Sequence, residues 1–147
     1  MRRRSVWATL ASRSLLLILP LLTIAGCEPP RDFPAWNRVT RIEVVETKRP
    51  QGVVKEIDDP RQVARIIAFV NANRTGYREP WFGEPLPPID VNFYERRRYK
   101  GHFGVGPEFF EIHRGTITFL SRPASFEEVR QFMELIGLDQ SMLWLRS

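Results

Sequence analysis

Two segments with the same apolar spacing limit most strongly what this chain can fold into. In each segment, apolar side chains recur at i, i+3, i+4 and i+7, which places them on one face of a helix. These positions are Val63, Ile66, Ile67 and Val70 in the first segment and Val129, Phe132, Met133 and Ile136 in the second. The sequence therefore predicts two amphipathic helices, each of which needs an apolar surface to cover.

The ends of both helices have recognisable sequences. Asp59, followed by Pro60 and by Gln62 three residues after the cap, is typical of a helix start, and so is Ser125 with Glu128. Each segment is followed by a glycine, at positions 76 and 137, and a glycine is favoured where a helix ends. Both helices are therefore expected to begin at a side-chain cap and end near a glycine.

The remaining segments have the alternation of β-strands. Ile89, Val91 and Phe93 alternate with polar residues, which indicates a strand with one buried face. Similar segments are found at 41–47, 53–57, 99–105, 108–113 and 116–120. Short connections between them favour hairpins. The predicted fold class is α+β: a mainly antiparallel sheet of about six strands with two helices packed against it, in the order β-β-α-β-β-β-β-α.

Composition excludes several classes of protein. The chain has 147 residues, of which 43% are hydrophobic, so it fits one domain and is too apolar for a disordered chain. One cysteine excludes an internal disulfide framework and a cysteine-rich zinc site. Residues 1–26 hold four of the 22 basic residues and none of the 17 acidic ones, which leaves the rest near +1. That balance argues against binding to nucleic acid.

The first 26 residues have the three zones of a secretory signal peptide. A basic region with four arginines comes first, an eleven-residue apolar stretch covers 15–25, and small residues end it. The apolar stretch is shorter than the about 20 residues that a helix needs to cross a bilayer. The sequence thus predicts export and removal of residues 1–26.

The exit of this segment, Ile24-Ala25-Gly26-Cys27, resembles the lipobox of bacterial lipoprotein precursors. The resemblance implies transfer of a diacylglyceryl group to the Cys27 sulfur, cleavage between Gly26 and Cys27, and fatty acylation, for example with palmitate, of the new amino group. In that class an aspartate after the cysteine often signals inner-membrane retention. Glu28 stands there in this chain. We expect a lipid-anchored protein of the cell envelope, on the outer membrane and facing the periplasm if the cell is Gram-negative.

The chain therefore divides into a signal peptide (1–26), a lipidated cysteine with a proline-rich tether (27–37), and a single α+β domain (38–147). Three prolines in 28–37 favour an extended spacer with a reach of about 30 Å. Phe33 and Trp36 provide an alternative, in which the tether docks onto the domain. The apolar tail 142–145 could likewise pack on the core or form a contact surface.

Two histidines and a glutamate are the only candidates for metal chemistry that the sequence singles out. His102, Glu111 and His113 are expected on one face of neighbouring strands, where they could hold a zinc ion or supply the polar outer face of a sheet. No cofactor and no catalytic residue are predicted. The glycines at 101, 104 and 106 precede a strand rather than a helix, so they are expected to relieve twist or form a bulge.

Two surface features are candidate binding elements. Trp81 and Phe82 lie in a proline-rich loop and could contact a partner or fold back over the sheet. The basic run 96–100 could contact lipid phosphates or form a solvated hairpin tip. The predicted function is a non-enzymatic binding domain, anchored in the membrane, with an envelope protein as one possible partner. The alternatives are a small metal-dependent hydrolase using the two histidines and the glutamate, and a structural envelope protein.

Overall fold

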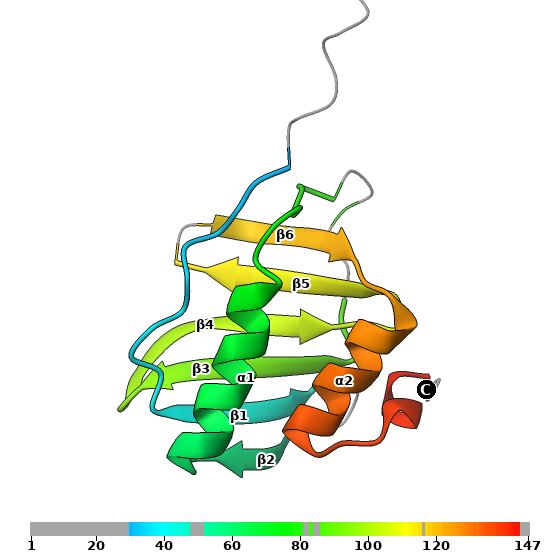
Figure 1. Ribbon diagram of the computed structural model, residues 1–147. Helices are drawn as coiled ribbons and strands as arrows, with labels where there is room; N and C mark the ends of the chain where they lie inside the picture. The colour runs from blue at the N-terminus through cyan, green and yellow to red at the C-terminus, as the bar shows by residue number, and fades with distance from the viewer. Residues whose placement is uncertain (1–29, 48–51, 81–82, 84–85, 116, 145–147) are drawn as a thin grey trace, which may run out of the picture.

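The computed structural model describes residues 30–47, 52–80, 83, 86–115 and 117–144, with the side chains of residues 117 and 118 excepted (Figure 1). The strands are β1 (Arg41–Glu46), β2 (Gly52–Ile57), β3 (Ile89–Glu95), β4 (Arg98–Val105), β5 (Phe109–Arg114) and β6 (Ile117–Pro123). The helices are α1 (Pro60–Ala72) and α2 (Phe126–Ile136), followed by a single-turn 3₁₀ helix, η2 (Gln140–Leu143).

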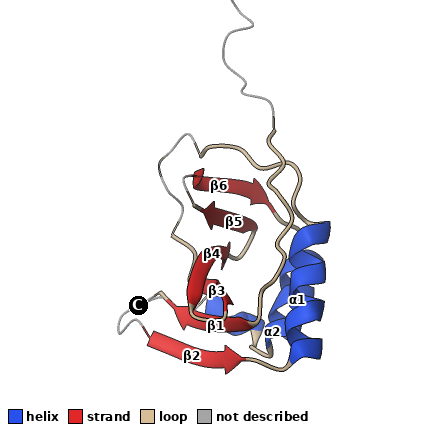
Figure 2. Cartoon of the chain, turned by 90° about the vertical axis from the view of Figure 1, so that its left-hand side faces the viewer, coloured by secondary structure: helices blue, strands red, loops and turns tan. Residues whose placement is uncertain are grey.

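The strands form one sheet in the order β2-β1-β3-β4-β5-β6. Each neighbouring pair is antiparallel. Both helices lie on the same side of this sheet, as Figures 1 and 2 show. The predicted α+β fold and the predicted order of its elements are therefore confirmed.

The predicted caps start both helices. The Asp59 carboxylate accepts a hydrogen bond of 2.8 Å from the Gln62 amide, and Ser125 and Glu128 form a complete capping box. At the other end of α2, Gly137 adopts a left-handed conformation with φ of 72°, as expected. The expectation for α1 is wrong: α1 ends at Ala72 with Asn73 as its C-cap, because the Asn73 side chain and amide bond back to carbonyls of the last turn. The glycine at 76 belongs to the turn beyond.

The apolar core lies between the sheet and the helices, on the face that we call the inner face. The predicted stripes of α1 and α2 and inward-pointing residues of every strand from β1 to β6 belong to one hydrophobic cluster. Four aromatic rings form the centre, with Phe132 of α2 in contact with rings from α1, β4 and β5; its partners are Phe69, Phe103 and Phe110. Apolar burial of this kind is the main stabilising term of the domain.

The segment 31–37, which we call the stem, packs onto this inner face beside α1 (Figure 1). Arg31 pairs with Tyr77 in an antiparallel bridge, and the Phe33 and Trp36 side chains are buried. The Trp36 amide donates to the Asn71 side chain at 2.7 Å, and that side chain donates back to the Trp36 carbonyl at 2.9 Å. Of the two alternatives for this part of the tether, docking is the one observed.

One glycine lets the stem approach the sheet. Gly101 has φ of +131° and lies where the β3–β4 register shifts. A Cβ atom there would come within 2.7 Å of the Trp36 ring and would also clash with the His113 carbonyl oxygen. The bulge expected from the glycines of β4 is thus found at this residue, and it also makes room for the stem.

After α2 the chain returns to the core. Leu143 in η2 is buried, whereas Trp144, the last described residue, is exposed. The tail therefore packs against the core through its leucine and leaves an indole at the surface. In the part of the chain that the structure describes, no helix has the length and apolar character needed to cross a membrane.

Candidate functional site

The two histidines lie side by side on the outer face of the sheet, which is the face away from the helices. His102 of β4 and His113 of β5 are register partners, and their rings stack with centroids 5.3 Å apart. Phe119 of β6 continues the stack, with its ring centroid 5.1 Å from that of His113. Three neighbouring strands thus present one row of parallel rings.

Glu111 lies beside this row and is almost completely buried, with 1% of its surface exposed. Its Oε1 atom is 3.4 Å from His102 Nε2, and its Oε2 atom has no hydrogen-bond partner among the described residues. The burial has a local cause. Gly104, the register partner of Glu111, has no side chain, and Pro87 of the preceding loop packs against it.

Tyr99 completes the arrangement from the other side of His102. Its hydroxyl lies 3.0 Å from His102 Nδ1, so the imidazole is bracketed by a phenol and a carboxylate. Burial raises the pKa of Tyr99 to about 12, and the nearby carboxylate of Asp90 contributes in the same direction. The phenol therefore stays protonated at neutral pH and orients the imidazole.

The structure brings together the three residues that the sequence singled out, but not in the form of a metal site. Within the described ranges, no group of three histidine, cysteine or acidic side chains could hold a metal ion. The lone pairs of ring nitrogens lie in the ring plane, so two imidazoles stacked at an interplanar angle of 26° direct them nearly side by side. The contacts that the structure shows within the cluster are ring stacking and hydrogen bonds.

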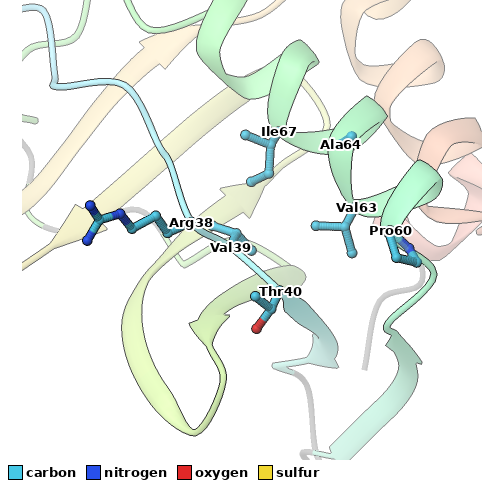
Figure 3. Close-up of a pocket in the computed structure, with 7 residues that line it drawn as sticks. All are labelled: Arg38, Val39, Thr40, Pro60, Val63, Ala64 and Ile67. Atoms are coloured by element: carbon cyan, nitrogen blue, oxygen red, sulfur yellow. The ribbon is translucent and has the colours of Figure 1, made fainter.

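A groove lies at the other side of the molecule, between the segment 38–40 and the first half of α1 (Figure 3). Its volume is about 240 Å³, and most of the surface that lines it is apolar. In Figure 3 the side chains of Val63 and Ile67 point from the helix toward Val39 on the opposite wall. The remaining lining residues are Arg38, Thr40, Pro60 and Ala64.

A second hollow, of about 450 Å³, adjoins this groove and shares Arg38 and Thr40 with it. The β3–β4 turn forms its other wall and contributes Glu95, Arg96 and Arg98. We call Arg38, Arg96 and Arg98 the arginine cluster. It joins residues that lie almost 60 positions apart in the sequence, because the stem ends next to this turn.

Basic residues outnumber acidic ones in the lining of the hollow, which has three arginines and one glutamate. Its one carboxylate, Glu95, is 3.0 Å from the Lys100 ammonium group. The hydrogen bond from Lys100 lowers the pKa of Glu95, and the charges of Arg38 and Arg98 act in the same direction. Among the described residues, no carboxylate lies within ion-pair distance of the arginine cluster.

Several residues that the sequence predicted as functional lie outside the described residues: Gly26, Cys27, Trp81 and Phe82. Conversely, sequence reasoning missed Tyr99 as a partner of His102, Phe119 as part of the stack, and Arg38 as a neighbour of the basic run. Alternation along β4 and β6 is the signal that could have found the first two residues. Nothing local links Arg38 to the β3–β4 turn.

Comparisons with known proteins give no further information about the function of this chain. No family model matches this chain, and neither the curated proteins nor the solved structures contain a significant match.

Proposed function

We propose that this chain is a lipoprotein of the bacterial cell envelope whose α+β domain binds its ligand or partner without chemistry. The observation that carries the proposal is the sole cysteine at position 27, directly after a short apolar stretch and two small residues. Two or three acyl chains on Cys27 would hold the protein stably at a bilayer, whereas one chain binds only weakly. Glu28 favours the outer membrane, with the domain facing the periplasm.

The docked stem supports a close and oriented attachment. Only residues 28–30 separate Cys27 from Arg31, which is already paired with Tyr77. An extended chain reaches about 3.5 Å per residue, so Arg31 lies within roughly 14 Å of the anchored residue. The end of the domain that carries Tyr77 and β6 is thereby kept next to the bilayer, and the opposite end projects away from it.

A binding role suits the outer-face cluster better than catalysis does. The imidazole of His102 is 15% exposed and Glu111 is 1% exposed, so the pair has little surface to offer a substrate. A general acid or base must come within hydrogen-bond distance of the group that it serves. His113 and Phe119, whose rings stack on each other, are both partly exposed and could contact a partner.

The anchoring proposal is tested by metabolic labelling with radioactive palmitate, followed by separation of membranes from soluble protein. The wild-type chain is expected to incorporate label and to sediment with membranes. The Cys27→Ala variant is expected to incorporate none and to lose its mature, membrane-bound form. A variant that is labelled and retained like the wild type would refute the proposal. Ser5→Ala, a change in the same leader, serves as the matched control.

A further inference from the structure

We propose that the groove beside α1 and the adjoining arginine cluster together bind an anionic amphiphile: an alkyl chain that ends in a phosphate or carboxylate. The alkyl chain would lie in the apolar groove, and the headgroup would lie among Arg38, Arg96 and Arg98. The inference rests on the binding role proposed above, but it assigns that role to this groove rather than to the outer-face cluster, and it gives the role a ligand class.

The apolar half of the site has the lining that an alkyl chain needs. Val39, Val63 and Ile67 face one another across the groove, and Ala64 leaves its helix-side wall open (Figure 3). Each methylene group moved from water into such a lining contributes about 0.8 kcal/mol. A polar ligand would gain little from this wall, because few of its atoms could find hydrogen-bond partners there.

The basic half supplies the complementary charge. Three arginine residues line a hollow in which the single carboxylate is already paired with Lys100. Arginine presents a planar fork of N–H donors that matches phosphate and carboxylate oxygens. A cationic or neutral headgroup would leave these charges uncompensated, so the hollow selects for anions.

Two of these arginines have left-handed backbone. Arg38 and Arg96 both have φ of 56°, and they are the only described residues other than glycine with positive φ. Thr40 joins them: its Oγ1 atom accepts a hydrogen bond of 2.6 Å from the Arg96 amide, and its own amide donates to Tyr94. Left-handed backbone is uncommon at residues other than glycine, and at Arg96 it belongs to the two-residue turn between β3 and β4.

The site lies at the opposite end of α1 from Arg31, which follows the proposed anchor residue by four positions. The groove is lined by Pro60 and by residues of the first two turns of α1, whereas Arg31 pairs with Tyr77 beyond the last turn. The 13 residues of α1 span about 20 Å, and Figure 1 shows the stem entering above β6 and ending beside β1. The ligand is therefore an amphiphile taken up from the aqueous space, not a lipid of the bilayer that holds the anchor.

The test uses the chain from residue 27 onward with Cys27→Ser. It carries no acyl group and keeps every core residue, the first of which is Phe33. Calorimetric titration with dodecyl phosphate, below its micelle concentration, is expected to show saturable binding at one site. Inorganic phosphate and dodecyltrimethylammonium, which each match only half of the site, are expected to bind at least about tenfold more weakly. Equal binding of either probe would overturn the proposal.

Matched variants measure separately how much the apolar groove and the arginine cluster contribute to binding. Ala64→Phe fills the groove and is expected to weaken dodecyl phosphate binding about tenfold or more, whereas Ala68→Phe, one turn further along α1, should leave it unchanged. Exchange of all three clustered arginines for glutamine should weaken it similarly and remove its salt dependence, in contrast to Arg65→Gln. Thermal melting checks that each variant is folded. If a control loses as much affinity as its partner variant, the site lies elsewhere.

A final experiment distinguishes a free amphiphile from a membrane lipid as the ligand. Vesicles with anionic phospholipids, added in place of dodecyl phosphate, are expected not to bind this unacylated chain. Vesicle binding that depends on the arginine cluster would show a membrane-docking surface and would overturn the assignment to a free amphiphile. Because these experiments use Cys27→Ser, their failure leaves the lipid anchor untouched, and failure of palmitate labelling leaves the groove untouched.

Discussion

The two faces of the sheet carry different kinds of side chains, although the same strands form both. On the inner face, side chains such as Ile42, Phe93 and Phe103 are completely buried under the helices and the stem. On the outer face, the strands carry two histidines, a tyrosine and a buried glutamate, and Pro87 packs over part of them. The inner face is apolar and therefore stabilises the fold, whereas the outer face keeps polar groups at a cost to stability.

This contrast also explains where the binding features lie. The apolar groove and the arginine cluster sit at the margin of the inner face, where the stem ends before β1. At such a margin an apolar wall and a charged turn can meet without disturbing the core. Three substitutions test how far the two faces differ in their contribution to stability.

The largest effect is expected for Phe132→Ala in α2. Phe132 has no exposed surface and contacts three other aromatic rings. Its truncation should lower the free energy of unfolding by about 3–5 kcal/mol. Phe126→Ala in the same helix is the control: Phe126 is 62% exposed, and its loss should change stability by about 0.5 kcal/mol or less. Urea denaturation measures both, and similar losses would contradict the inner-face core.

An intermediate and pH-dependent effect is expected for Tyr77→Phe, where the stem meets the inner face. Burial raises the pKa of Tyr77 above its ordinary value of 10, although the Arg122 charge opposes this shift. The unfolded chain therefore ionises first, so the contribution of Tyr77 is complete below about pH 10 and is lost as the pH rises further.

Urea denaturation at about pH 8 and about pH 11 checks this prediction. The variant should lose less stability between the two pH values than the wild type, while Tyr94 and Tyr99 titrate in both proteins. At the lower pH the change should be small, because the Tyr77 hydroxyl has no hydrogen-bond partner among the described residues. Identical pH dependence in the two proteins would show that Tyr77 ionises freely in the fold.

The smallest effect is expected for Glu111→Gln on the outer face. Its carboxylate is buried with one long contact to His102, so removal of the charge relieves a desolvation cost. We expect stability to rise by about 1 kcal/mol or less, with exposed Glu108→Gln as a neutral control. A loss of more than about 2 kcal/mol would mean that a partner satisfies the carboxylate, and the contrast between the faces would then fail.

Local features of the fold were predictable from the sequence, and long-range ones were not. The caps at Asp59 and Ser125 depend on residues three positions apart, and the strands depend on alternation, so a single sequence contains both signals. The end of α1 differs from the prediction because the Asn73 side chain closes the last turn before the glycine is reached. Side-chain caps of this kind compete with glycine and leave a weaker pattern.

The candidate sites could not be predicted without the tertiary structure. Alternation placed His102, Glu111 and His113 on one face, but the stacking of the rings and the burial of Glu111 depend on Gly104 and Pro87. The groove was not predictable, because the stem had an extended alternative and its docking brings position 38 next to the β3–β4 turn. Contacts between such distant segments are set by packing rather than by any local pattern.

The attachment at position 27 is the central claim, and mass spectrometry of the protein isolated from membranes tests it most directly. The amino-terminal peptide is expected to begin at Cys27 and to carry the mass of a diacylglyceryl thioether plus an amide-linked acyl group. A peptide that begins at any other residue, or an unmodified Cys27 thiol in the membrane-bound protein, would contradict the claim.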